Sequence, residues 1–133
     1  MRASVYHVQL NVTDAAVSVP FYHRLLGYLE YRVLVGSDGL LGMSNGTTDV
    51  WIVQTPADRA GRAFHRRNPG LNHLAVRVTA REDVDRFNDE FLARAGIAPL
   101  YGGPRDYPEY RPGYYAVFFE SPDRLKLEVA YVP

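Results

Sequence analysis

The chain contains 133 residues with a mass of 15.0 kDa, enough for one domain or for two very small units that share a core. Hydrophobic residues make up 47% and charged residues 23%, which is typical of globular chains rather than disordered ones. The 15 Lys and Arg residues balance the 15 Asp and Glu residues, and this zero net charge argues against a nucleic-acid-binding protein, whose affinity depends on surplus cations.

The first half of the chain predicts a strand, a helix and three more strands. Residues 4–12 alternate between apolar and polar side chains, which is the period of a strand. The polar face of this strand carries His7, Gln9 and Asn11. We expect the following helix to begin near Ser18, because Pro20 is tolerated only in a first turn, and to end at Gly27. The three further strands are expected over residues 28–35, 40–44 and 49–55.

The second half predicts the same order of elements. Residues 73–78 repeat the alternation, and a helix is expected to start at the capping box of residues 79–82 and to end at Gly96. The strands after this helix are expected over residues 97–101, 114–120 and 125–132. Two long irregular segments remain, residues 56–70 and 99–113, and loops of this length are usually functional or mobile.

The two halves also share residues at a constant offset. His7 and His73 are 66 positions apart (73 − 7 = 66), which is close to half of the 133-residue chain. Four more identities have the same offset: Val12 and Val78, Thr13 and Thr79, Phe21 and Phe87, and Leu26 and Leu92. Five identities in register indicate a duplicated half-domain.

The sequence therefore predicts an α+β fold of two paired βαβββ modules. We expect one domain over residues 1–133, with modules at about residues 1–56 and 71–133 joined by a loop at residues 57–70. If the helices cover the apolar faces of two curved half-sheets, the remaining faces line a shared concavity. His7 and His73 would then approach each other there.

A metal site is the predicted chemistry of this concavity. The chain has no cysteine, so His and carboxylate side chains must hold any metal ion. Glu128 lies in the middle of the last predicted strand, between apolar neighbours, where an unpaired carboxylate is costly. With His7 and His73 it completes a set of two histidines and one carboxylate, which leaves coordination positions open for an oxygen ligand. The alternative is that these polar faces simply point to water.

Several motifs resemble those of the vicinal oxygen chelate superfamily, which includes glyoxalase I, extradiol dioxygenases, methylmalonyl-CoA epimerase, fosfomycin-resistance transferases and bleomycin-binding proteins. The motifs are His-Val-x-Leu-Asn-Val-x-Asp at residues 7–14, Ser-x-x-Phe-Tyr at 18–22, Leu-Leu-Gly at 25–27, Leu-Asn-His-Leu-Ala-Val at 71–76 and Ser-Pro-Asp-x-x-Lys-Leu-Glu at 121–128. The resemblance implies the paired βαβββ fold and a divalent metal held at His7, His73 and Glu128. The implied chemistry is stabilisation of an enolate, alkoxide or similar oxyanion by the ion.

Departures from the individual subfamilies leave the activity open. Glyoxalase I and the epimerase use a fourth ligand, but aligning Pro56 with Pro133 places Trp51 opposite Glu128, and the remaining donor, Gln54, needs a shifted register. The extradiol dioxygenases have an additional His and Tyr that this chain lacks at the matching places. The fosfomycin transferases have a threonine where this chain has Gln9. Bleomycin-type binders generally lack the ligands.

Other residues are predicted to line the concavity. Strand parity selects four wall candidates: Gln9, Asn11, Trp51 and Arg77. The aromatic-rich segment 99–115 reads either as a rigid surface loop or as a lid in which Arg105 or Arg111 pairs with a substrate carboxylate or phosphate. Tyr115 is predicted as a proton-donating hydroxyl that faces the cavity. The basic run at residues 59–67 reads as solvated surface or as a place of anion capture.

The leading functional prediction is a metal-dependent, glyoxalase-like lyase or isomerase acting on a small oxygenated metabolite, with Glu128 and Tyr115 as catalytic groups. The rivals are a bleomycin-type protein that sequesters an aromatic compound and an extradiol-type dioxygenase. The ligand set suits Fe, Mn, Zn or Ni. A homodimer is expected, with the cup formed in one chain or across two. Without a signal-peptide core or an apolar run of roughly 20 residues, a cytoplasmic location without membrane partners is expected.

Overall fold

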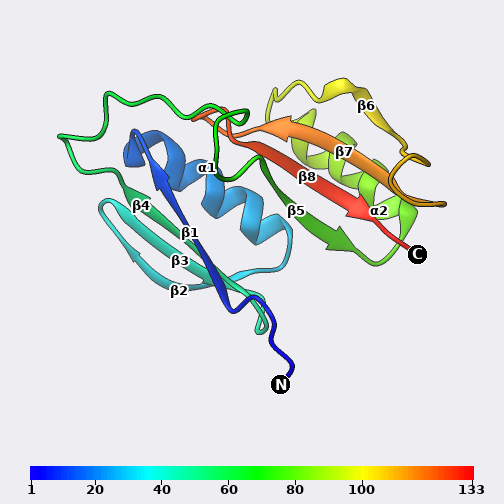
Figure 1. The fold of residues 1–133 in the computed structure, drawn as a ribbon, viewed down its shortest axis with the longest axis horizontal. Helices are drawn as coiled ribbons and strands as arrows, with labels where there is room; N and C mark the ends of the chain where they lie inside the picture. Colours follow the sequence, from blue (N-terminus) through cyan, green and yellow to red (C-terminus); the bar gives the residue numbers. More distant parts are fainter. The chain divides into compact units, whose positions relative to one another are not determined.

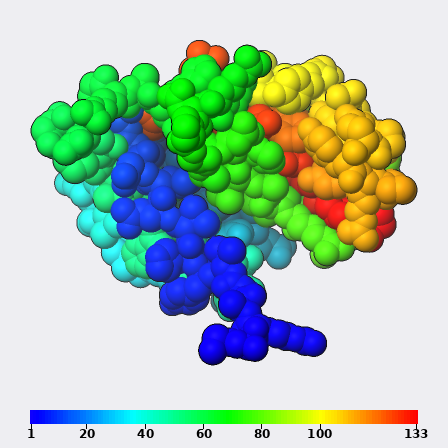
Figure 2. Space-filling view, in the orientation of Figure 1, coloured from blue at the N-terminus to red at the C-terminus, as the bar shows by residue number.

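The computed structural model describes residues 1–133 and contains two compact units, residues 1–63 and 64–133 (Figure 1). Each unit contains a four-stranded mixed sheet and a helical segment, and the α+β class and the repeated βαβββ order are confirmed. Residues 1–6 are exposed, and the N-terminal end of the chain projects from the first unit (Figure 2). Neither helical segment has the length and apolar character that crossing a bilayer requires.

In the first unit, β1 runs parallel to β4, and the strand order is β1-β4-β3-β2. Helix α1 packs against β3 and β4, so the apolar residues on that face of the sheet form the core. Ile52 and Val12 are 0% and 1% exposed there. The elements of this unit are β1 (His7–Val12), α1 (Ala15–Tyr28), β2 (Arg32–Ser37), β3 (Leu40–Ser44) and β4 (Asp49–Gln54).

Helix α1 begins earlier than the sequence predicts. Its first residue is Ala15 rather than one near Ser18, and Pro20 therefore lies inside the helix. Two side chains satisfy the first amides of the helix: the Asp14 carboxylate accepts from the Ala16 amide at 2.9 Å, and Gln54 Oε1 accepts from the Ala15 amide at 2.7 Å. These caps offset the hydrogen bond that Pro20 cannot donate, which is why the expected boundary was wrong.

The second unit repeats this plan with the strand order β5-β8-β7-β6 and with β5 parallel to β8. Helix α2 packs on β8 and β7, and Phe87, Val117 and Val129 are at most 1% exposed in the resulting core. The elements are β5 (His73–Val78), α2 (Arg81–Arg86), the π-helical segment η1 (Phe87–Leu92), β6 (Leu100–Asp106), β7 (Tyr115–Glu120) and β8 (Lys126–Tyr131).

The start of α2 differs by one residue from the predicted capping box. The N-cap is Ala80, and the carboxylate of Asp83, not that of Glu82, accepts from the Ala80 amide at 3.0 Å and from the Thr79 hydroxyl at 3.3 Å. In a complete capping box the side chain at the N-cap also accepts from the backbone amide of the third helical residue. This second bond is missing here because the N-cap, Ala80, has no side-chain acceptor.

Strand β6 also lies further along the chain than predicted. It spans Leu100–Asp106, inside the segment 99–113 that the composition predicts as irregular. Tyr101, Gly102 and Gly103 have φ angles of 57°, 85° and 103°, and the pairing with β7 shifts its register between Leu100 and Arg105. Two glycines and Pro104 hide this strand from a propensity argument, because such residues usually mark bulges or edges.

The registers of the two sheets align the halves residue by residue. In the first unit Gln9 pairs with Trp51, and in the second unit Ala75, which is 66 positions after Gln9, pairs with Glu128. The predicted correspondence of Trp51 with Glu128 is therefore confirmed. The same strand position carries an aromatic ring in one half and a carboxylate in the other.

Candidate functional site

The candidate site lies on the face of the second sheet that α2 does not cover. Leu127 and Val129 of β8 point into the core, so Glu128 points to the other face. Glu128 is nevertheless only 2% exposed. Phe118 stands directly opposite it on β7, and both side chains therefore share this face.

Two of the three predicted metal ligands meet here. His73 Nε2 lies 3.1 Å from Glu128 Oε2. The ring of His73 is also edge-on to that of Phe118, with 6.1 Å between the centroids. A buried carboxylate is costly unless it is paired, and His73 lies within ion-pair distance of it.

Asn72 fixes the orientation of the His73 ring. Asn72 Nδ2 donates to the Arg66 carbonyl at 3.0 Å, which directs the amide oxygen toward His73. That oxygen lies 2.8 Å from His73 Nδ1, so Nδ1 carries the proton it donates. Nε2 is thereby left facing Glu128. A hydrogen bond of this kind to the remote nitrogen is typical of metal-ligating histidines.

The hydroxyl that reaches Glu128 belongs to Tyr114. It donates to Glu128 Oε1 at 2.6 Å, a short bond as expected for an ionised acceptor. Burial and this hydrogen bond raise the pKa of Tyr114 above its ordinary value, so the hydroxyl keeps its proton. Tyr114 just precedes β7, and the sequence pattern predicted its neighbour Tyr115 for this position instead.

Tyr115 does not face this site. Its hydroxyl donates to Asp85 at 2.6 Å, and the Arg81 guanidinium lies 3.6 Å from the centre of its ring, both groups on α2. Burial, together with the bond to Asp85, raises the pKa of Tyr115 to about 12. Tyr115 and Val117 share one face of β7, as predicted. The pairing of β7 with β8 places that face against α2, away from Glu128.

The predicted aromatic loop packs partly over the same face of the sheet. Tyr107 is 2% exposed and contacts Phe118 edge-on at 5.2 Å, in a buried cluster with Ala116 and Ala130. Tyr110 stacks on Tyr107 with 5.4 Å between ring centres. The Tyr107 hydroxyl is buried without a hydrogen-bond partner. These rings form an apolar wall close to Glu128.

In the first unit, His7, Gln9 and Asn11 lie on the exposed face of β1, as the alternation predicts. Gln9 and Asn11 share a weak hydrogen bond of 3.4 Å between their side chains. Trp51 is half-buried on the neighbouring strand, and its ring lies directly over Gly42, where an added Cβ would come within 2.4 Å of the indole. Only glycine leaves room for this ring.

Two further predicted residues, Gln54 and Arg77, form local hydrogen bonds, and a third, Arg111, is exposed. Gln54, considered as a fourth metal ligand, uses its amide nitrogen on the Thr13 and Thr55 carbonyls and its amide oxygen on α1. Arg77 donates to the Val132 carbonyl, and the side chain of Arg111 is exposed. Both the amide oxygen and the amide nitrogen of Gln54 are therefore engaged in hydrogen bonds within the first unit.

The donor set near Glu128 fits a divalent metal in its chemistry. Imidazole nitrogen and carboxylate oxygen suit several first-row ions. Taken alone, neither unit contains a cluster of three or more His, Asp or Glu side chains that could hold an ion. Within the second unit the arrangement supplies two ligands, His73 and Glu128, and a group that orients one of them.

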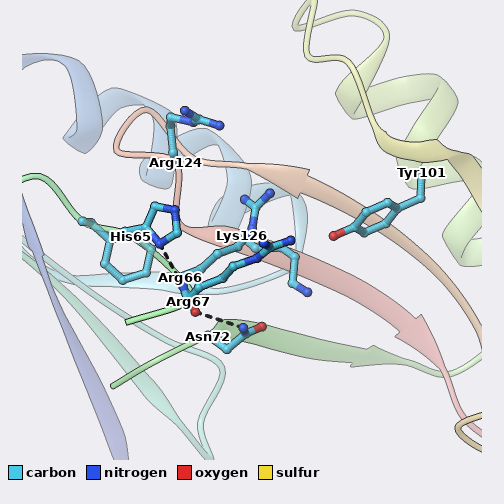
Figure 3. A pocket seen from close by; sticks show the side chains of 8 residues that line it. His65, Arg66, Arg67, Asn72, Tyr101, Arg124 and Lys126 are labelled. Carbon is cyan, nitrogen blue, oxygen red and sulfur yellow. Dashed lines mark hydrogen bonds between the residues drawn. The ribbon is translucent and has the colours of Figure 1, made fainter. Parts of the chain in front are cut away.

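A basic pocket lies in the second unit, and Asn72, which contacts His73, is one of its lining residues. Figure 3 shows the side chains that line it. Its volume is about 480 Å³. Four cationic side chains line it: Arg66, Arg67, Arg124 and Lys126. The aromatic rings of Phe64 and Tyr101 complete part of the wall. The basic run at residues 59–67, predicted as either solvated surface or a place of anion capture, thus contributes Arg66 and Arg67 to this pocket.

Comparisons with known proteins agree with this fold. Residues 4–129 match the Glyoxalase/Bleomycin resistance protein/Dioxygenase superfamily. The uncharacterized protein YqjT of Bacillus subtilis is 34% identical over 130 residues, covering 94% of this chain and 96% of its own.

Solved structures show the same likeness. A putative glyoxalase from Bacillus halodurans is 34% identical, with a TM-score of 0.83 over 96% of this chain and 95% of that one. A glyoxylase/bleomycin resistance protein/dioxygenase domain from Frankia sp. EAN1pec shares the fold, with 24% identity and a TM-score of 0.75 over 100% of both chains. The family match spans nearly the whole sequence, and the chain belongs to the glyoxalase/bleomycin resistance protein/dioxygenase superfamily.

Proposed function

We propose that this chain is a metal-dependent, glyoxalase-like enzyme that acts as a lyase or isomerase on a small oxygenated metabolite. One observation carries the proposal. The Glu128 carboxylate is 2% exposed in mid-strand, 3.1 Å from His73 Nε2, and the His73 ring is held at Nδ1 by Asn72. A buried acid held this way favours a metal ligand over a surface residue, because nothing in the core requires a charge there.

The ligands of this proposal are His73 and Glu128, with His7 as the third. His7 is the counterpart of His73 in the repeat, and it is exposed at the first residue of β1 as His73 stands at the first residue of β5. The third ligand comes from the same chain or from a second copy. Since Gln54 is engaged in capping α1, we expect three protein ligands. The ion is Fe, Mn, Zn or Ni, all of which accept this set.

A bound divalent ion would act as a Lewis acid that stabilises oxyanionic charge, such as that of an enolate. The chain's own groups supply proton transfer and shielding. Glu128 would accept a proton from the substrate. The Tyr114 hydroxyl donates a hydrogen bond to Glu128 Oε1 and so keeps the carboxylate oriented. Phe118 and Ala130, both 2% exposed, keep water away from Glu128. Dry surroundings strengthen each of these electrostatic contacts.

Trp51 supports a second candidate, a protein that sequesters a small aromatic compound. Its indole rests on Gly42 on the exposed face of the first sheet, which leaves a flat ring for stacking. In that function the chain would bind the aromatic compound without converting it. Trp51, at the position equivalent to Glu128, would be the stacking surface.

Metal analysis combined with isotope exchange tests the proposal. We expect about one equivalent of metal per wild-type chain, and a large loss in His7→Ala, His73→Ala and Glu128→Ala. His23→Ala serves as the matched control, because His23 is exposed on α1. Full metal content in the His73 and Glu128 variants would overturn the ligand assignment.

Exchange separates the enzyme from the binder. A panel of small α-hydroxy and α-keto compounds is incubated with the protein in D₂O and followed by proton NMR. The enzyme catalyses deuterium incorporation beside the carbonyl of its substrate, and Glu128→Gln abolishes it. A metal-free protein that binds flat aromatics without exchange would support sequestration instead.

We also propose a homodimer that uses strand β2. This strand is an edge of the first sheet, and its Val33, Leu34 and Val35 are 48%, 52% and 42% exposed. An exposed apolar edge offers unpaired backbone groups to a second chain. Light scattering should report a dimer for the wild type and a monomer for Leu34→Lys, and a wild-type monomer would refute this assignment.

A further inference from the structure

We propose that the basic pocket beside His73 binds the anionic group of an organic substrate, a carboxylate or a phosphate. The inference rests on the proposed function, because it names the class of metabolite that the site accepts. All the residues that carry it belong to the second unit. It predicts that the reacting end of the substrate lies at His73 and Glu128 while a charged group lies in the pocket.

The charges in the pocket wall favour an anion. Four cationic side chains line it, and Glu120 pairs with two of them, accepting from Arg66 and, at 3.4 Å, from Arg124 Nε. Arg67 and Lys126 are not among the partners of Glu120. The chain as a whole is neutral. In this pocket, however, the single negative charge of Glu120 offsets only one of the four positive charges. An excess of cations around a concavity attracts anions and holds them by charge-assisted hydrogen bonds.

Glu120 holds two of these cations in place rather than neutralising the pocket. Burial acts to raise the pKa of Glu120, but hydrogen bonds from Arg66 and Arg124 outweigh it and lower the pKa below its ordinary value. Glu120 therefore stays ionised near neutral pH. The guanidinium groups keep further N–H donors that this carboxylate does not use, because each guanidinium carries five.

The size and walls of the pocket indicate an organic anion rather than a bare ion. A volume of about 480 Å³ falls within the range of small-molecule sites. Phe64 and Tyr101, which are 39% and 56% exposed, offer aromatic surface to a carbon skeleton. Tyr101 has a φ of 57°, a strained conformation for a tyrosine, and such strain is concentrated at ligand-binding segments.

The pocket is joined to the candidate metal ligands by direct contacts. Asn72 lines the pocket and also holds His73 Nδ1 at 2.8 Å. Lys126 pairs in register with His73 across β5 and β8, and its ammonium lies 5.1 Å from the Phe118 ring, which His73 also contacts. A small substrate anchored at Lys126 would therefore extend over the His73–Glu128 pair.

Binding measurements with three probes of similar ring size test the inference. Phenyl phosphate, benzoate and benzyl alcohol are titrated by calorimetry into the full chain at low ionic strength. We expect phenyl phosphate and benzoate to bind and benzyl alcohol to bind at least tenfold more weakly. Raising the salt concentration should weaken the binding of both anions and leave the affinity for the alcohol unchanged, because salt screens exposed charges. The stronger of the two anions identifies the group that the substrate carries.

Two variants localise the anion. Arg67→Ala and Lys126→Gln each remove a cation without leaving a carboxylate unpaired, and each should weaken anion binding about tenfold, the loss of one charge-assisted hydrogen bond. Arg94→Ala is the matched control, since Arg94 is an exposed arginine outside the pocket wall. Equal binding of the alcohol and the anions, or wild-type affinity in both pocket variants, would overturn the proposal.

The outcome is separable from that of the metal proposal. Metal content is measured on the same samples, and Arg67→Ala should retain the wild-type amount. If the protein holds no metal but the anions still bind through Arg67 and Lys126, the pocket is right and the metal centre is wrong. If metal is bound but neither variant changes anion affinity, the pocket is wrong and the metal centre stands.

Discussion

Replacing Tyr114 with phenylalanine removes one hydroxyl from the candidate site and little else. The Tyr114 hydroxyl donates to Glu128 Oε1 at 2.6 Å, and Glu128 is 2% exposed, so water cannot freely take the place of this donor. A hydrogen bond to an ionised group contributes about 1.5–3 kcal/mol. Because Tyr114 itself is only half-buried, we take the lower part of this range and expect Tyr114→Phe to cost about 2 kcal/mol.

Urea denaturation of the metal-free protein measures this cost as a lower free energy of unfolding with an unchanged m-value. Metal affinity provides a second reading on the same variant. Partners that orient a ligating group typically change affinity by about 10- to 100-fold. We expect a loss near the lower end, because Asn72 still orients His73.

The same substitution at Tyr107 is a matched comparison. Its hydroxyl is buried without a partner, so Tyr107→Phe should leave the free energy of unfolding unchanged or raise it slightly. Equal destabilisation at the two positions would show that ring packing, not the bond to Glu128, sets the cost. A Tyr114→Phe protein with wild-type stability and wild-type metal affinity would refute the role given to Tyr114.

Three further predictions concern residues outside this contact. Gln54→Ala should destabilise the chain by about 1 kcal/mol, because α1 loses a cap at Ala15, and urea denaturation would register it. Gly42→Ala should cost about 1–3 kcal/mol and shift the fluorescence of Trp51, because the new methyl group occupies the place of the indole. Glu120→Gln should lower stability at pH 7 by about 1 kcal/mol. Since the folded pKa of Glu120 lies below its ordinary 4.5, this difference is complete above pH 4.5 and vanishes as the pH falls through the folded value, which denaturation at several pH values can follow.

Periodicity and repetition made most of the fold predictable. Strand β3 has the bounds expected from the sequence, and β1, β4 and β8 differ from expectation mainly at their ends. Aligning Pro56 with Pro133 gave the correspondence of Trp51 with Glu128 before any register was known. These features follow from side-chain alternation, which acts over a few residues and can be read directly from the chain.

The errors have a common physical origin in contacts between distant residues. Helix α1 starts at Ala15 because Gln54, 39 positions away, accepts from its first amide. Strand β6 forms across glycines because β7 provides its hydrogen-bond partners. Local propensity contains neither partner, so the sequence assigned a later helix start and an irregular loop.

The site was predictable in its residue types but not in its supporting contacts. Alternation placed His73 and Glu128 on the faces expected to line the concavity, and in the structure His73 Nε2 lies 3.1 Å from Glu128 Oε2 within the second unit. Face assignment failed for β7, because a choice between Tyr114 and Tyr115 depends on register with β8, which a single strand does not reveal. The role of Asn72 was missed for the same reason, although it directly precedes His73 in the resembled motif.

The duplicated register suggests how one backbone plan serves two purposes. At equivalent positions the first module carries Trp51, supported by Gly42, and the second carries Glu128, supported by Tyr114. An indole on a glycine is a surface for stacking, whereas a buried carboxylate bonded by a tyrosine is a group for holding charge. Because the strand pairing is the same in both, the difference resides in these side chains and not in the backbone. Exchanging chemistry at this one position thus leaves the fold intact, which is why membership of the superfamily alone does not specify an activity.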